Sequence, residues 1–202
     1  MKLNNLENLK QYFETNDVIS YHNIQNETLN KFSLDNIEIK NCVLTNTNIL
    51  SCNMEKIYIS NTTFKNCNLS NSVFYKSTLN NVVLENCNLV GCDFSCSYLK
   101  ALKAITCKAN NIILDESRIQ NSNFSDSLFE NSSFESCNIK DVIFENINFF
   151  GSNFSNTSLD CIDFSTCNIQ GITVYPTDLK GVILTEYQAL DFIQILGIRL
   201  KK

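Results

Sequence analysis

The sequence of 202 residues has no tryptophan, one proline, one histidine and five glycines, and no long apolar run interrupts its polar residues. Without a run of about 18 apolar residues, neither a membrane span nor a signal peptide is expected. A single imidazole, His22, offers little for Cys–His or Ser–His–Asp catalysis, and no glycine-rich phosphate loop is present. These absences argue against an enzyme and against a membrane protein.

Positive charge is also scarce, since 16 Lys and Arg stand against 21 Asp and Glu, which gives a net charge of −5. A negative protein has little electrostatic attraction for nucleic acid or for anionic membranes. Ten cysteines without a visible signal peptide are expected to be reduced thiols in the cytosol. We therefore expect a cytoplasmic protein that binds neither nucleic acid directly nor a membrane.

A five-residue period runs through most of the chain. Every fifth residue from Ile19 to Leu184 is apolar at all 34 positions, and we name this the central position. Two residues earlier stands a small or slim residue, and two residues later often Asn or Gly, which accept turn conformations at low cost. Neither a helix nor a strand places residues five apart on one face. The pattern predicts a chain that turns a corner every five residues and points two side chains inward.

The motifs Cys67-Asn68-Leu69-Ser70-Asn71 and Ser122-Asn123-Phe124-Ser125-Asp126 resemble the pentapeptide-repeat family. The resemblance covers residues 19–184 and implies an all-β solenoid, a right-handed quadrilateral parallel β-helix with four pentapeptides per coil and about eight coils. Stacked coils would pair their backbones about 4.8 Å apart around a continuous core.

The two ends of the chain depart from the repeat. Residues 1–18 place Leu3, Leu6, Leu9 and Phe13 at helical spacing, which predicts an N-terminal helix that caps the rod. Residues 185–202 begin with the capping-box pair Thr185 and Gln188 and predict a second helix with a tail.

Apolar residues cover more than one face of this C-terminal helix. One face can cover the last coil, and the remainder needs another partner, most simply a second copy of the chain. Relatives in the family dimerise through C-terminal helices, so the resemblance also implies a homodimer; the alternative is that the helix folds back and buries itself. The candidate dimer interface comprises Tyr187, Leu190, Phe192, Ile193 and Leu196.

The repeat weakens between residues 100 and 113, where the central positions shrink to Ala104 and Ala109 while the phase is kept. We expect a thin or bulged coil here, and the alternative is a binding loop.

The positions of the cysteines predict that most of them are small side chains packed in the core. Eight of the ten occupy the small inward slot, where Ser, Thr and Val also occur, whereas Cys96 and Cys161 fall on the corners and are expected to be exposed thiols. No C-x-x-C pair is present, and zinc requires ligands that converge on a point. Neither a metal nor another cofactor is expected.

Residues 110–170 hold nine acidic side chains against two basic ones. Members of the quinolone-resistance group of the family imitate duplex DNA and bind type II topoisomerases, so an acidic rod is compatible with this role. The spacing, however, sends three of the acids to one side and three to the opposite side. The candidate acidic surface comprises Asp115, Glu116, Asp126, Glu135, Glu145 and Asp163.

The favoured function is a non-enzymatic scaffold for protein–protein interaction in a bacterial cytosol, where the bacterial origin follows from the resemblance alone. The alternative is a DNA-mimicking binder of DNA gyrase or topoisomerase IV that protects against quinolones. An enzyme of the β-helical lyase kind ranks third, because its metal-binding acids and basic catalytic residue cannot be located in the sequence.

Overall fold

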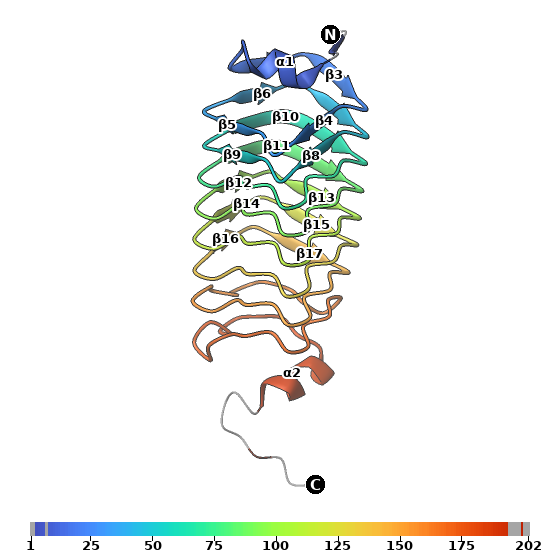
Figure 1. Cartoon of the computed structure of the whole chain (residues 1–202). Helices are drawn as coiled ribbons and strands as arrows, with labels where there is room; N and C mark the ends of the chain where they lie inside the picture. The colour runs from blue at the N-terminus through green and yellow to red at the C-terminus, as the bar shows by residue number, and fades with distance from the viewer. Residues whose placement is uncertain (1–2, 7, 194–198, 200–202) are drawn as a thin grey trace.

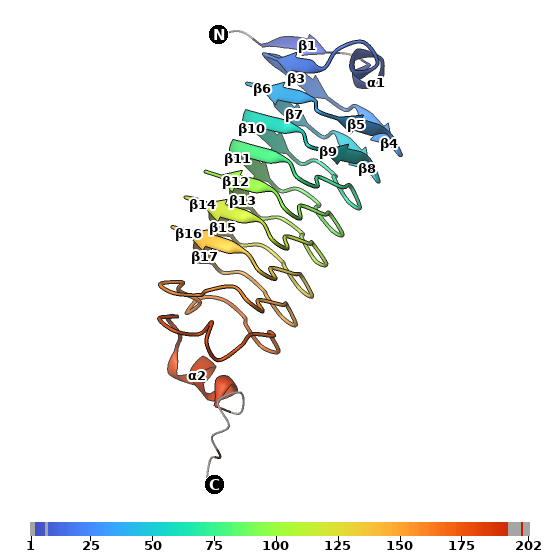
Figure 2. The ribbon, with the colours of Figure 1, turned by 90° about the vertical axis from the view of Figure 1, so that its left-hand side faces the viewer.

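The computed structural model describes residues 3–6, 8–193 and 199. These residues form a rod of stacked coils with helix α1 (Leu9–Phe13) at one end and helix α2 (Glu186–Phe192) at the other (Figures 1 and 2). The strands are β1 (Asn4–Leu6), β2 (Val18–Ser20), β3 (His22–Gln25), β4 (Thr28–Asn30), β5 (Ser33–Asp35), β6 (Glu38–Lys40), β7 (Val43–Thr45), β8 (Asn48–Leu50), β9 (Asn53–Glu55), β10 (Tyr58–Lys65), β11 (Thr78–Glu85), β12 (Tyr98–Lys100), β13 (Lys103–Ile105), β14 (Arg118–Gln120), β15 (Asn123–Ser125), β16 (Asn138–Lys140) and β17 (Ile143–Glu145).

The strands pair in parallel, and from β2 onward each residue lies beside the residue 20 positions later, as Ile59 lies beside Leu79. A 20-residue coil contains four pentapeptides, so the predicted four-sided solenoid is confirmed. The first ladder face stacks β2, β6, β10, β11, β12, β14 and β16, and the second stacks β3, β7, β10, β11, β13, β15 and β17. The other two sides, here the turn faces, carry β4 and β8 or β5 and β9 and continue as isolated bridges such as Asn68↔Asn88.

The predicted inward slots fill the core. Central residues from Ile19 to Val174 are almost all buried, and the preceding small residues, such as Cys92 and Ser152, are buried with them. Large rings pile up along the rod, as Phe134 and Phe154 do with parallel planes and ring centroids 4.7 Å apart. Central side chains of adjacent coils therefore contact each other, which gives the continuous core expected of a solenoid.

The corners explain the preference for Asn and Gly. The residue two positions after the central one adopts a positive φ in coil after coil, for example 57° at Asn71 and 67° at Gly91. This left-handed conformation is costly for most side chains and cheap for Gly, with Asn and Asp next. At Gly91 a Cβ atom would also lie 2.5 Å from Oδ1 of Asn71, so a larger residue there would have to displace the Asn71 amide.

The ladder faces and the turn faces differ in how their corners use hydrogen bonds. On the turn faces the central carbonyl accepts from the backbone N–H three residues on, as Leu69 does from Ser72 at 3.2 Å. An Asn or Asp before the central residue braces this turn, as Asn68 Oδ1 does by accepting from Ser70 N–H at 3.1 Å. Hydroxyls join successive coils at the corners of both kinds of face, since Leu102 N–H donates to Ser122 Oγ at 3.0 Å and Cys52 N–H donates to Ser72 Oγ at 3.1 Å.

The N-terminal segment is not one helix. Residues Asn4–Leu6 form β1, which pairs with β3, and α1 is only five residues long. Without β1, strand β3 of the first coil would be an unpaired strand edge. Residues Asn4–Leu6 form backbone hydrogen bonds with that edge, although the spacing of the apolar residues predicts a helix here. Glu27 then fixes α1, because its carboxylate oxygens accept from the N–H groups of Asn8 and Leu9 at 3.1 and 2.9 Å.

Residues 100–113 form a regular coil and not a loop or a bulge. Strand β13 pairs on both sides, and Ala104 and Ala109 are 1 % and 0 % exposed. The small side chains leave an apolar cavity of about 20 Å³ between Leu84, Ala104 and Phe124. The coil is therefore thin only inside, because the backbone hydrogen bonds hold its path whatever the size of the central residue.

Candidate functional site

Three of the candidate acids gather on one side of the rod. Asp115 and Glu135 occupy the same column of one turn face, and Glu116 stands at the next corner. Asp115 is fixed, because its Oδ1 accepts from the Ser133 hydroxyl at 2.5 Å and from Glu135 N–H at 3.0 Å. One oxygen of this carboxylate is therefore occupied by hydrogen bonds within the rod.

The other three candidate acids lie on the opposite side. Glu145 and Asp163 belong to the second ladder face and line one surface hollow of about 370 Å³ together with Ile143 and Cys161. Asp126 stands at the corner of this face, where it accepts from the Asn146 amide at 3.0 Å. The Ser165 hydroxyl and backbone N–H hydrogen-bond to Asp163 and lower the pKa of its carboxyl.

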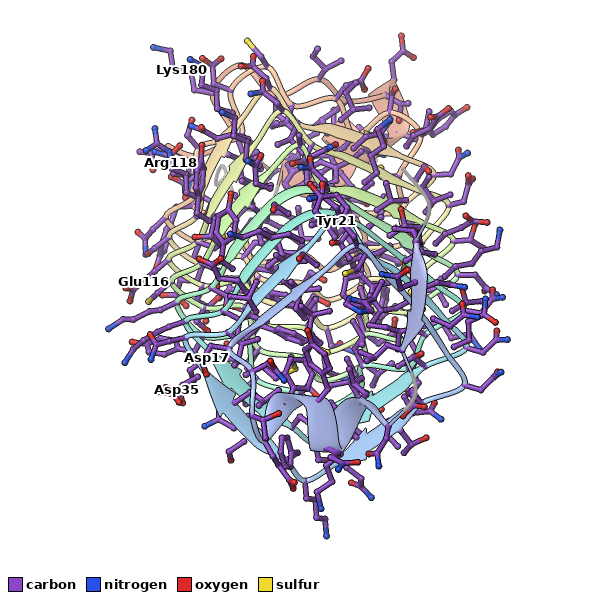
Figure 3. The ribbon with its side chains drawn as sticks, turned by 90° about the horizontal axis from the view of Figure 1, so that it is seen from above. Asp17, Tyr21, Asp35, Glu116, Arg118 and Lys180 are labelled. Carbon is purple, nitrogen blue, oxygen red and sulfur yellow. The ribbon has the colours of Figure 1, made fainter. Side chains whose placement is uncertain are left out.

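The six acids therefore form two groups on opposite faces, as their spacing predicts, and no single acidic stripe joins them. A view along the rod shows Glu116 and Arg118 projecting from the same side (Figure 3). Arg118 lies over the ring of Tyr98 at 5.7 Å, so a cation interrupts the negative surface beside Glu116.

Exposed apolar side chains share the same half of the rod. Among the residues that the structure describes, ten large hydrophobic side chains are exposed, and eight of them lie between Ile113 and Leu190. Four of them, Ile113, Leu128, Ile143 and Ile183, occupy the outward slot just before a central position, so the sequence itself carries a signal for them. The eight are Ile113, Leu128, Ile143, Phe150, Tyr175, Ile183, Tyr187 and Leu190.

Helix α2 divides the candidate dimer residues. Its capping box is formed as predicted, and the Gln188 amide also donates to the carbonyls of Phe164 and Cys167, both at 2.8 Å, which closes the last coil. Tyr187 and Leu190 are 84 % and 51 % exposed. Phe192 is buried at 6 %, so it packs on the rod of its own chain and is not available to a partner.

The two remaining dimer candidates are less informative. Ile193 is half-buried, and Leu196 lies outside the described residues. Of the candidate dimer residues, Tyr187 and Leu190 are the exposed ones in α2, and they are three residues apart and share one helix face.

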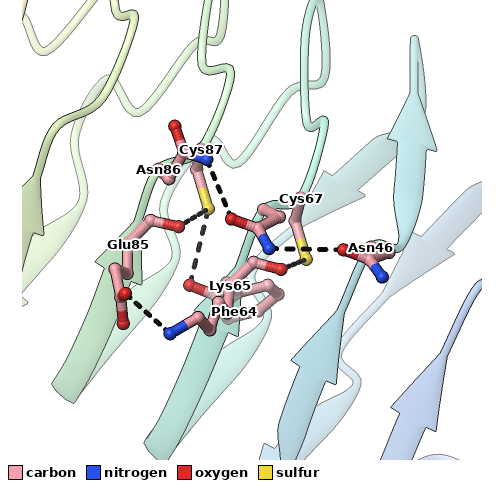
Figure 4. A network of polar contacts seen from close by, with 8 residues as sticks. Asn46, Phe64, Lys65, Cys67, Glu85, Asn86 and Cys87 are labelled. Carbon is pink, nitrogen blue, oxygen red and sulfur yellow. Dashed lines mark hydrogen bonds and ion pairs between the residues drawn. The ribbon is translucent and has the colours of Figure 1, made fainter.

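The cysteines behave as core filler. Cys67 and Cys87 stack in one column, and each thiol donates to backbone carbonyls, as Cys87 does to Phe64 at 3.5 Å (Figure 4). Burial raises the pKa of the Cys92 thiol to about 12 and that of Cys137 to about 11. Cys161 is exposed and Cys96 partly so, as their corner positions predict.

Beside these thiols, polar side chains link the coils on the outside. The Asn86 amide donates to Asn66 at 2.8 Å and the Asn66 amide donates to Asn46 at 3.3 Å, in a ladder along one corner (Figure 4). Such ladders stabilise the stack and leave few free polar groups on that corner for a partner.

Among residues 3–6, 8–193 and 199, no group of three or more His, Cys, Asp or Glu side chains is placed to hold a metal ion. No described helix is long and apolar enough to cross a membrane.

Comparison with protein families gives two matches. The family described as "Pentapeptide repeat region" matches residues 117–192, and that described as "Pentapeptide repeats (8 copies)" matches residues 57–95. No curated protein matches the sequence.

Several solved structures resemble the fold. QnrB1, a plasmid-mediated fluoroquinolone resistance protein, is 18% identical over 89% of this chain and 100% of its own, with a TM-score of 0.44. HetL, a pentapeptide-repeat protein involved in heterocyst differentiation regulation from the cyanobacterium Nostoc sp. strain PCC 7120, is 11% identical over 84% of this chain and 90% of its own, with a TM-score of 0.46. The catalytic domain of Agl-KA is 12% identical over 82% of this chain and 42% of its own, with a TM-score of 0.44.

Proposed function

Because this chain is a pentapeptide-repeat protein, we propose that it is a non-enzymatic scaffold that binds another protein through the C-terminal half of its rod. The observation that carries this proposal is the coincidence of exposed apolar side chains and surplus acid between residues 110 and 190. Apolar groups surrounded by polar and charged ones are typical of protein-binding surfaces. Ten unpaired cysteines suit a reducing compartment, so we place this function in the bacterial cytoplasm.

The outward column that contains both Asn30 and Phe150 offers a matched test. A photo-crosslinking amino acid at Phe150 is expected to capture one discrete protein in cells, whereas the same amino acid at exposed Asn30, at the other end of that column, is not. Capture from Asn30 alone, or from neither position in a folded and expressed chain, would contradict the proposal.

A second candidate function is a DNA-mimicking binder of DNA gyrase or topoisomerase IV that protects against quinolones. The nine acidic side chains of residues 110–170 favour it, and the division of the six candidate acids between opposite faces weakens it. A gyrase supercoiling assay with increasing protein, run with and without a quinolone, separates the two candidates. Inhibition or rescue that is lost in Asp115→Asn with Glu135→Gln would favour mimicry, and no effect in either arm would remove it.

We further propose that two copies associate through the exposed face of α2. Tyr187 and Leu190 would lose much of their water contact in such a pair, a gain of about 1.5–3 kcal/mol for each fully buried large apolar side chain. Sedimentation velocity of Leu190→Glu should show a weakened dimer, with Glu186→Gln as the control on the same helix. An unchanged sedimentation coefficient in Leu190→Glu, or a monomeric parent chain, would reject this contact.

A further inference from the structure

The charges of the rod are divided unevenly among its four sides. Residues 56–141 hold eight basic and eight acidic side chains, so this stretch as a whole is neutral. The first ladder face and its two corners carry five of the basic side chains and two of the acidic ones, both acids at corners. The basic residues are Lys56, Lys76, Lys100, Arg118 and Lys140, and the acids are Glu116 and Asp141. We name this side, from Lys56 to Lys140, the basic stripe.

The cations of the basic stripe are not neutralised within the rod. All five are exposed. In the part of the chain that the structure describes, the ion pairs are Lys40–Glu38 and Lys65–Glu85, so none of them involves the stripe. Their positive charge is therefore available to an anionic group from outside the chain.

Two tyrosine rings lie among these cations and hold some of them in place. The guanidinium of Arg118 lies over the ring of Tyr98 at 5.7 Å, and Lys40 Nζ lies over the ring of Tyr58 at 6.0 Å. Tyrosine and arginine are enriched where proteins bind proteins. Single-stranded nucleic acid binds by stacking its bases on aromatic rings, and rings already covered by cations suit that mode less well.

The basic stripe has the dimensions of one extended peptide. The two outward residues of each strand are two positions apart, which is about 6.6 Å. From Lys56 to Lys140 the stripe spans four coil spacings, about 19 Å, which is the length of about six residues of extended chain. Asp115 and Glu135 lie on the turn face that precedes the stripe along the chain, so a wider polyanion such as a nucleic-acid duplex would meet negative charge there.

We propose that the basic stripe is a docking surface for an extended acidic segment of a partner protein, whose carboxylates lie beside Lys100, Arg118 and Lys140. This surface is separate from the exposed Phe150, because Lys140 and Phe150 are ten residues apart in a 20-residue coil and lie on opposite sides of the rod. The inference goes beyond the function proposed above, since a scaffold with two such surfaces can hold two different partners at once.

Fluorescence anisotropy with a labelled oligoglutamate of about ten residues tests the basic stripe, because a protein with a net charge of −5 repels this probe except at a local basic surface. We expect saturable binding to the full chain at low salt, and weaker binding as salt is added. Lys100→Glu with Lys140→Glu should weaken binding at least about tenfold. The matched control, Lys103→Glu with Lys108→Glu, makes the same change in net charge at exposed positions on two other sides and should weaken binding less than about threefold.

Three outcomes would overturn the proposal. The first is the absence of saturable binding to the parent chain at low salt. The second is an equal loss in the two double variants, because binding would then follow net charge and not position. The third is tighter binding of a labelled oligothymidylate of the same length, which would assign the stripe to single-stranded nucleic acid.

Circular dichroism checks that each variant keeps its fold. Lys100→Gln with Lys140→Gln removes the two charges without reversing them, so it should give an intermediate loss of binding and serves as the test if the reversal disturbs the rod. The crosslink from Phe150 should be the same in Lys100→Glu with Lys140→Glu as in the parent chain, so the two surfaces can fail independently of each other.

Discussion

The coil of Ala104 and the coils of Phe134 and Phe154 follow the same backbone path but differ in the side chains that fill their interior. Ala104 lies between Leu84 and Phe124 in its column and leaves a small cavity, whereas Phe134 and Phe154 stack ring on ring. The 20-residue parallel register between coils is the same in both regions, although Ala104 lies on a ladder face and the two rings lie on a turn face. The path of the rod is therefore set by the corners and the backbone bonds, and the central side chains determine how much stability each coil adds.

Removing a ring from the filled region should have the largest effect. Phe154 is 0 % exposed and also meets Phe149 edge-on at 5.2 Å, so Phe154→Ala should lower the free energy of unfolding by about 3–5 kcal/mol. Urea denaturation followed by circular dichroism measures this loss. Phe150→Ala, which removes the same ring from an outward slot, should change stability by less than about 0.5 kcal/mol. Similar losses in both variants would mean that the two slots do not differ as described.

The dependence of the unfolding free energy on alkaline pH tests whether the cores of the two regions exclude water equally. The raised pKa of Cys92, near the cavity, and of Cys137, beside Phe134, means that the folded state keeps these thiols protonated at a pH where the unfolded chain ionises. Their stabilising effect is full below the ordinary thiol pKa of about 9 and is lost as pH rises toward 11 or 12, by about 1.4 kcal/mol per pH unit and thiol.

Cys92→Val and Cys137→Val should each flatten the decline in unfolding free energy between pH 9 and pH 10.5, as measured by urea titrations at fixed pH. A decline that is equally steep in parent and variants would show that these thiols ionise without opening the core.

Most of the fold that underlies this comparison can be predicted from the sequence. The central column, the small slot before it and the Asn corners predict the four-sided solenoid, because only inward residues must be apolar and only corners require a positive φ. Ala104 and Ala109 signal a thin coil, but the sequence does not tell a cavity from a bulge, since that depends on whether β13 keeps its backbone bonds. The same limit applies to β1, where pairing with β3 overrides the helical spacing of Leu3 and Leu6.

The candidate surfaces were predictable only in part. The 20-residue period places Asp115 on the opposite side of the rod from Glu145, because residues 20 apart stack in one column and residues 10 apart lie on opposite faces. It gives no sign that the strand pairing of the second ladder face ends at β17, where the next coil forms a tight turn in which Asp163 Oδ1 accepts from Ser165 N–H. Nor does helical periodicity show that Phe192 turns inward while Tyr187 and Leu190 stay outside, because the packing of α2 on the last coil decides this.

Filling the cavity beside Ala104 should raise the free energy of unfolding, by less than the Phe154→Ala substitution lowers it. Ala104→Val adds two methyl groups where Leu84 and Phe124 leave space, and it should raise the free energy of unfolding by about 0.5–1 kcal/mol. Val82→Ile adds one methylene at a site that is 0 % exposed and does not line the cavity, and it should cost about 1–3 kcal/mol. A lower urea midpoint for Ala104→Val would mean that the thin coil is already well packed.

The smallest effect is expected outside the core, where the two regions should not differ. Lys65 Nζ lies 2.8 Å from Glu85 Oε1 on the second ladder face, with the side chains 48% and 43% exposed. Water screens such a pair, so Lys65→Met should change the free energy of unfolding by less than about 1 kcal/mol, and 1 M salt should remove the difference. Urea titrations at low and high salt measure it, with Glu85→Gln as the reciprocal variant. A larger, salt-resistant loss would place part of the stability of the rod in its outer columns, and the contrast between filled and thin coils would then account for only part of it.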